Sequence, residues 1–276
     1  MLEYLNLSSK ARKIYKYKLT YIIRAKLDKK LKNFKVKVKK MSLNVLEEIN
    51  SIKENLDSGV DYKEEKKKFF QVVDFIKIHE IKDEEILGKI SELRYNMAKT
   101  WRPNQYSIRS GLILWTALVV FGGFLIYSTF WIWANLIGLG IWMNILYVIV
   151  LILGWLSINI GIHNLGHYIA GKLVGINFHG WVIREAVFQW ALVIEYKSYL
   201  KVTFRKRQIL HLSGPICTLG APWVIYLITL NPIMIGIGIY MIVASIPVMV
   251  KKKWDYGRIF KERQLKKQYN KAQKKI

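Results

Sequence analysis

Two long stretches without a charged side chain limit what this chain can fold into. Residues 111–170 and residues 211–250, which are 60 and 40 residues long, contain no Asp, Glu, Lys or Arg. A membrane-spanning helix needs about 20 apolar residues, so each stretch has room for two spans. The sequence therefore predicts a mainly α-helical, polytopic membrane protein with about four transmembrane helices. The first stretch breaks near 135–140, and the second divides into spans at 212–230 and 232–250.

The charged residues lie in three segments outside these stretches, and their sign predicts the orientation. The chain carries a net charge of +25, and Lys and Arg outnumber Asp and Glu in residues 1–110, 171–210 and 251–276 alike. Four spans place all three segments on one side of the membrane. Because basic loops stay on the cytoplasmic side, we expect an integral protein of the cell membrane with both termini in the cytoplasm. The single Cys217 excludes an intramolecular disulfide.

Composition divides the chain further into four regions. Residues 1–40 hold 14 Lys and Arg against 2 acids, which predicts a basic segment on anionic membrane lipids. An ordinary solvated arm is the alternative, and no nucleic acid is expected because no binding motif is present. Residues 41–110 show apolar stripes at helical spacing and predict a cytoplasmic helical module. The transmembrane core covers residues 111–250, and residues 251–276 form a basic cytoplasmic tail.

The cytoplasmic loop at 171–210 differs from the other charged segments in composition. Residues 182–204 are rich in β-branched and aromatic side chains, which are typical of strands. The fold class expected for the whole chain is thus a helical membrane core with a helical N-terminal module and a short β-rich loop.

Two histidines inside the second predicted span are the first candidates for chemistry. His163 and His167 are four residues apart, so they lie on one face of a helix where both imidazoles reach a single zinc ion. At a rise of about 1.5 Å per residue, both lie within about 15 Å of Lys172, which marks the cytoplasmic end of the helix. Ionisable side chains within spans are functional candidates, although two histidines hydrogen-bonded within a helical bundle remain an alternative.

The sequence around these histidines resembles a known family. The run from Gly161 through His163, Asn164 and Gly166 to His167 resembles the HExxH helix of the site-2 proteases, which are intramembrane zinc metalloproteases. Ser213-Gly214-Pro215 resembles the family's A-G-P stretch, and Pro247 with Asp255-Tyr256-Gly257 resembles its P-x-x-x-D-G segment. The resemblance covers about residues 151–260. It implies Zn²⁺ held by His163, His167 and Asp255, and a transmembrane-helix substrate or client protein presented by the strand region.

The sequence departs from the family pattern at the position of the general base. Asn164 replaces the family's catalytic glutamate, and an amide cannot take up a proton at any relevant pH. Thr218 replaces the family's asparagine after Gly-Pro, and Asp255 follows three lysines and a tryptophan. A helix cap at the start of the tail is the alternative role for Asp255. We therefore predict a homologue that binds zinc and membrane-helix clients but is catalytically impaired.

Two other functions stay open at this point. The first is an active metallopeptidase with an unconventional base, for which Glu185 and Glu195 are the acids in the loop. The second is a membrane scaffold without metal. His179 and His211 are further candidate ligands on the same side, but for His211 an interfacial hydrogen bond is the favoured interpretation. Cys217 is expected to be a small packing residue.

Overall fold

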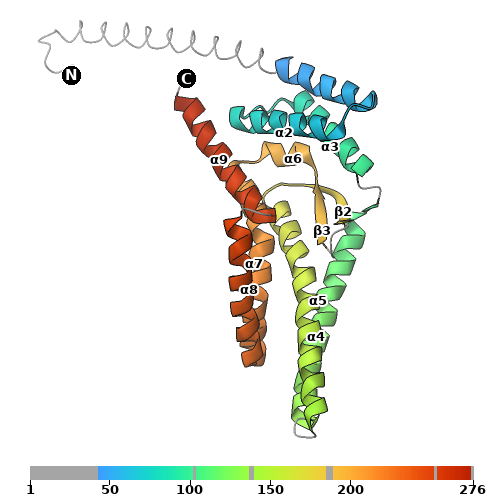
Figure 1. Cartoon of the computed structure of the whole chain (residues 1–276), viewed down its shortest axis with the longest axis vertical. Coiled ribbons are helices and arrows are strands. Elements are labelled where there is room, and N and C mark those ends of the chain that lie inside the picture. The colour runs from blue at the N-terminus through green and yellow to red at the C-terminus, as the bar shows by residue number, and fades with distance from the viewer. Residues whose placement is uncertain (1–42, 102–103, 137–139, 185–188, 252–253, 275–276) are drawn as a thin grey trace, which may run out of the picture. The chain divides into compact units, whose positions relative to one another are not determined.

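The computed structural model describes residues 43–101, 104–136, 140–184, 189–251 and 254–274 (Figure 1). The predicted basic segment 1–40 lies outside these residues. The chain forms two compact units, Met1–Val72 and Val73–Ile276, and the division falls within helix α2 (Tyr62–His79). Each unit is described by itself.

The first unit is helical in its described part. A helix covers 43–57, a turn follows at Ser58 and Gly59, and α2 then begins. Gly59 has φ +81°, a left-handed conformation that glycine adopts without steric cost. The predicted apolar stripe of Val45, Ile49 and Ile52 is buried, as expected for residues that share one helix face.

The second unit contains four helices that are long and apolar enough to cross a membrane: α4 (Ile108–Leu136), α5 (Ile141–Leu173), α7 (Phe204–Thr229) and α8 (Pro232–Val250). Their apolar side chains remain largely uncovered, and Trp142 and Leu227 are 79% and 72% exposed. Apolar surface on this scale is typical of helices that face lipid. The prediction of four membrane helices is thus confirmed by length and composition.

These helices pair in sequence order and pack closely where residues are small. Helix α4 packs on α5, α5 on α7, and α7 on α8. A Cβ at Gly122 of α4 would lie 2.5 Å from the carbonyl oxygen of Gly154 in α5, so the two backbones are in direct contact, as is common in membrane bundles. A Cβ at Gly166 of α5 would lie 2.7 Å from the Sγ of Cys217 in α7, so this side chain packs on the α5 backbone, which agrees with the packing role expected for Cys217.

The predicted β-rich loop forms part of a small antiparallel sheet in the order β1-β2-β3. Strand β1 is Gln105–Tyr106, β2 is Phe178–Arg184 and β3 is Gln189–Ile194. Trp181 in β2 pairs with Tyr106 on one side and with Leu192 on the other. The 3-stranded sheet thus joins the segment before α4 to the loop between α5 and α7.

The strand prediction was wrong beyond residue 194. Tyr196–Lys201 forms the short helix α6, and α7 begins at Phe204 instead of residue 212. The side chain of Thr203 accepts a hydrogen bond from the backbone N–H of Lys206 and so caps α7. The charge-free stretch 211–250 covers only the apolar part of this helix, because the first turn of α7 carries Arg205, Lys206 and Arg207.

Two further helices complete the described chain. Helix α3 is Glu84–Trp101, within the segment 41–110 that was predicted to be helical, and it packs against α6. Helix α9, Trp254–Lys274, follows α8 and packs against α7. The predicted basic tail is therefore a helix with buried residues, among them Glu262 and Leu265.

Two neighbouring glycines in α4 test the close packing of the bundle. We expect Gly122→Ala to lower the free energy of unfolding by about 1–3 kcal/mol, the usual cost of overpacking, because the new methyl group meets Gly154 and Ile158. Gly123→Ala is the matched control, since a Cβ at Gly123 has no neighbour within 4 Å. Thermal unfolding in detergent measures both variants, and equal stability of the two would contradict the packing described here.

Candidate metal centre

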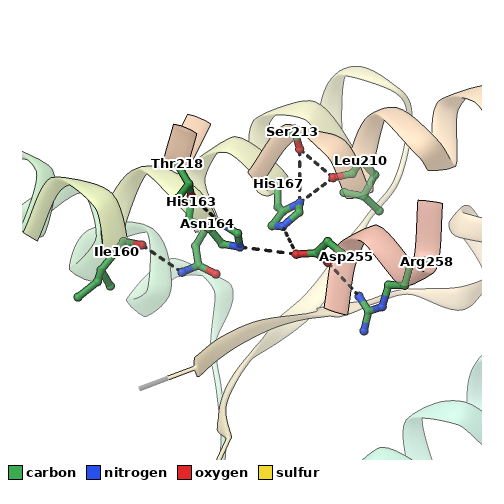
Figure 2. A network of polar contacts seen from close by, with 9 residues as sticks. All are labelled: Ile160, His163, Asn164, His167, Leu210, Ser213, Thr218, Asp255 and Arg258. Carbon is green, nitrogen blue, oxygen red and sulfur yellow. Dashed lines mark hydrogen bonds and ion pairs between the residues drawn. The ribbon is translucent and has the colours of Figure 1, made fainter. Parts of the chain in front are cut away.

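Three potential metal ligands come together from two helices that are far apart in the sequence. His163 and His167 lie on α5, and Asp255 lies in the first turn of α9 (Figure 2). Asp255 Oδ2 is 3.3 Å from His167 Nε2 and 3.7 Å from His163 Nε2. One ligand atom from each of the three residues lies within 4.8 Å of the others. The structure thus brings together the three residues that the sequence proposed.

The two nitrogen–oxygen distances are near those of a tetrahedral metal site. Zinc binds imidazole nitrogen and carboxylate oxygen at about 2.0–2.2 Å, so neighbouring ligand atoms of a tetrahedron lie about 3.4 Å apart. The two nitrogen–oxygen distances are close to this value, and the donor set of two imidazoles and one carboxylate is one that zinc uses. The three residues could therefore hold a metal ion.

The second ring nitrogen of each histidine makes its own hydrogen bond. His167 Nδ1 lies 2.6 Å from the carbonyl oxygen of Leu210, and His163 Nδ1 lies 2.8 Å from Thr218 Oγ1. A carbonyl only accepts, so Nδ1 of His167 carries the proton and the lone pair of the neutral ring is on Nε2. That lone pair faces the Asp255 carboxylate, and only a proton or a cation between the two atoms makes this arrangement favourable. Hydrogen bonds of this kind orient histidines at metal sites.

Gly214 makes room for the His167 ring at the contact between α5 and α7. A Cβ at position 214 would lie 2.6 Å from Cδ2 and 2.7 Å from Cε1 of His167. The imidazole therefore lies flat against the backbone of α7, where its Nδ1 reaches Leu210. This contact gives a physical reason for glycine in the Ser213-Gly214-Pro215 stretch.

The surroundings of Asp255 favour its charged form. Burial alone would raise the pKa of this carboxyl, but the hydrogen bond that His167 donates when both ring nitrogens carry a proton, and the nearby positive charge of Arg258, bring it below its usual value. Arg258 Nη1 lies 3.9 Å from Oδ1, on the side away from the histidines. An ionised carboxylate is the form that binds a metal ion.

Asn164, which the resemblance places at the position of the general base, makes its hydrogen bond within its own helix. Its side chain is buried and its Nδ2 donates a hydrogen bond of 3.2 Å to the carbonyl oxygen of Ile160 in the same helix (Figure 2). The amide is thus bound to its own backbone.

The other residues considered from the sequence have different partners. His211 is buried and its Nε2 lies 3.0 Å from the hydroxyl of Tyr199, so it makes a hydrogen bond as expected. His179 packs against the ring of Tyr95. Glu195 directly precedes α6 and does not line the cavity described below, while Glu185 lies outside the described residues.

A cavity of about 350 Å³ adjoins the three ligands and extends to the sheet. Its polar wall includes Asn164, His211 and Thr218, and its apolar wall includes Ile160, Phe178 and Ile194. Trp190, Ala191 and Leu192 of β3 also line it. Successive residues of a strand point to opposite faces of a sheet, so three consecutive lining residues mean that the cavity touches the edge of β3. Within the described part of the chain, β3 pairs only with β2 and this edge is open.

Sequence reasoning missed several groups that shape the centre. Asn159 lines the cavity one helical turn before His163, and its buried Oδ1 has no hydrogen-bond partner. Asn159 could have been found from the sequence, because residues 159, 163 and 167 are spaced four apart and share one helix face. The Leu210 carbonyl belongs to the backbone, so no residue type marks it. The buried contacts of Glu262 with Lys77 and Arg207 were also missed, because these residues are far apart in the sequence.

Comparisons of the chain with protein-family models, with curated proteins and with solved structures gave no match.

Gly214 offers a test of the centre that leaves the three ligands in place. We expect Gly214→Ala to reduce metal binding strongly, because the added methyl group displaces the His167 imidazole. Gly220→Ala on the same helix is the control, since a Cβ at Gly220 has no neighbour within 4 Å. Titration of the purified variants with Zn²⁺ compares them, and unchanged affinity in Gly214→Ala would refute the placement of His167.

Proposed function

We propose that this protein is a membrane-embedded zinc-binding protein of site-2-protease type that binds membrane-helix clients without cleaving them efficiently. Zinc would be held by His163, His167 and Asp255. The observation that carries the proposal is the convergence of these three side chains, with the Nε2 atoms of both histidines directed at one carboxylate oxygen. When bound, zinc would act there as a Lewis acid toward an oxygen ligand.

The open edge of β3 supports the binding of an extended client segment beside the metal centre. An unpaired strand edge offers backbone N–H and C=O groups to another chain, and strand addition is a common mode of peptide recognition. The edge of β3 lines the same cavity as His163 and Asp255. A client helix that unwinds locally exposes backbone N–H and C=O groups, and this edge would offer them partners.

Asn164 supports binding without efficient hydrolysis. Cleavage of a peptide bond requires a group that takes up a proton and delivers it to the departing amine. An amide does neither, and the one at position 164 is bound to the Ile160 carbonyl. Glu195, one of the two acids considered as substitutes, does not line the cavity.

The orientation and the lipid contacts belong to the same proposal. We propose that both termini and the 171–210 loop lie in the cytoplasm, because all charged residues of the chain flank the same ends of the four spans. The basic segment 1–40 and the basic residues of α9 would then face anionic lipid headgroups.

Metal content tests the first part of the proposal. Protein purified in detergent is expected to contain about one zinc ion per chain, since three ligands suffice for a site with an open position. His163→Ala and Asp255→Asn each remove a ligand and are expected to lose the metal, whereas His179→Ala is the control because His179 packs against Tyr95. Elemental analysis decides, and a wild-type chain without metal after exposure to Zn²⁺ would favour the scaffold function.

Restoring the carboxylate tests the second part. We expect negligible cleavage of transmembrane-helix substrates by the wild-type protein and detectable cleavage by Asn164→Glu, because general acid–base catalysis contributes about 10²–10⁴-fold. Asn164→Gln is the matched control, since it has the same length without the charge. The assay is run with and without a zinc chelator. Robust chelator-sensitive cleavage by the wild-type protein would establish an active metallopeptidase with a different base.

A further inference from the structure

A buried ion cluster lies beside the candidate metal centre and uses none of its ligands. Glu262 of α9 accepts hydrogen bonds from Lys77 of α2 and from Tyr199 of α6, the latter at 3.0 Å. Arg207 of α7 donates from Nε to the other carboxylate oxygen at 2.7 Å. All four residues are buried. One carboxylate therefore ties α9 to three other helices.

Charge and burial make this cluster sensitive to the loss of any member. Burial alone would raise the pKa of Glu262, but the positive charges of Lys77 and Arg207 lower it below its usual value. Burial raises the pKa of Tyr199, so its phenol stays neutral and donates its proton. Removing one partner from a buried ion pair leaves an uncompensated charge, which is strongly destabilising. The contacts of Glu262 thus hold α9 in its position against the neighbouring helices.

Glu262 and Asp255 lie on the same face of one helix. They are seven residues apart in α9, which corresponds to two turns and about 10 Å along the axis. The same face lies against α7, where Arg207 contacts Glu262 and the Leu210 carbonyl binds His167. The position of Asp255 relative to the two histidines therefore depends on how α9 is seated against α7.

The cluster also contacts the cavity through His211. Tyr199 donates its proton to Glu262, so its oxygen accepts the N–H of His211 Nε2 at 3.0 Å. His211 lines the cavity, but this hydrogen bond commits its Nε2 to Tyr199. The same carboxylate thus fixes the helix that carries Asp255 and, through Tyr199, the orientation of a nearby imidazole.

We propose that Glu262 is a positioning residue of the metal centre: its contacts with Lys77, Tyr199 and Arg207 hold α9 so that Asp255 faces His163 and His167. This inference rests on the proposed metal-binding function. The inference predicts that Glu262, which contacts none of the three candidate ligands, affects the centre only through the position of Asp255.

A double-mutant cycle on the full-length protein in detergent tests the inference. We expect Glu262→Gln to weaken Zn²⁺ binding by about 10–100-fold, the usual effect of changing a residue that supports a ligand. In the Asp255→Asn background, where the two histidines leave only weak binding that is titrated at higher Zn²⁺ concentration, the same substitution is expected to cause no further loss, since coupling appears when two residues act through one contact. Arg263→Gln is the control, because it also changes the charge of α9 by one unit but its side chain is exposed.

A second readout uses the metal-free protein and separates this inference from the proposed function. The chain has five histidines, so imidazole ¹⁵N signals are assignable by single substitutions. His167 Nε2 lies 3.3 Å from Asp255, and Asp255→Asn is expected to shift its signal. Glu262→Gln should shift it in the same direction. A wild-type protein that binds no zinc would end the proposed function, whereas the imidazole signals still decide the role of Glu262.

Two results would overturn the inference. The first is unchanged zinc affinity together with unchanged imidazole signals in Glu262→Gln. The second is an equal loss of affinity with and without Asp255, which would mean a general structural effect. If Glu262→Gln does not fold, Lys77→Met replaces it, because Arg207 and Tyr199 still hold the carboxylate. A smaller loss that depends on Asp255 is then expected, and no loss would contradict the proposal.

Discussion

The contact of α5 with α7 and α9 determines the chemistry available to this protein. Two imidazoles on α5 meet a carboxylate from α9, and the ring of His167 lies on the bare backbone of Gly214 in α7. Polar groups inside a membrane protein are costly unless they find partners. The Leu210 carbonyl and the Thr218 hydroxyl satisfy one nitrogen of each histidine, so that the other nitrogen is directed to Asp255.

This arrangement separates metal binding from proton transfer. The three candidate ligands lie together, but the Asn164 amide bonds to the backbone of its own helix. On the proposed function, the three side chains and the edge of β3 would hold a zinc ion and an extended client. On the same proposal, the protein lacks only the group that moves protons. The ion cluster around Glu262 then serves to keep the third ligand in position.

Much of the helical architecture could be predicted from the sequence, because lipid imposes a simple rule on composition. The charge-free stretches located four apolar helices, and the break after 230 agrees with the start of α8 at Pro232. The strand prediction failed at residues 196–204, where aromatic residues form α6 and the start of α7. β-propensity depends strongly on tertiary context, so composition alone did not separate helix from strand here.

The pairing of His163 with His167 followed from helical spacing, whereas Asp255 was reached only through the family resemblance. The Glu262 cluster joins residues that are 55 to 185 positions apart, and no local pattern indicates such contacts.

Zinc X-ray absorption spectroscopy of the purified, zinc-loaded protein tests the central claim most directly. The account predicts a first shell of nitrogen and oxygen atoms at about 2.0–2.2 Å, with the scattering pattern of two imidazoles and without sulfur. The imidazole contribution is expected to fall in His163→Ala and to persist in His211→Ala. A sulfur ligand from Cys217, or a shell that loses an imidazole in His211→Ala but not in His163→Ala, would contradict it.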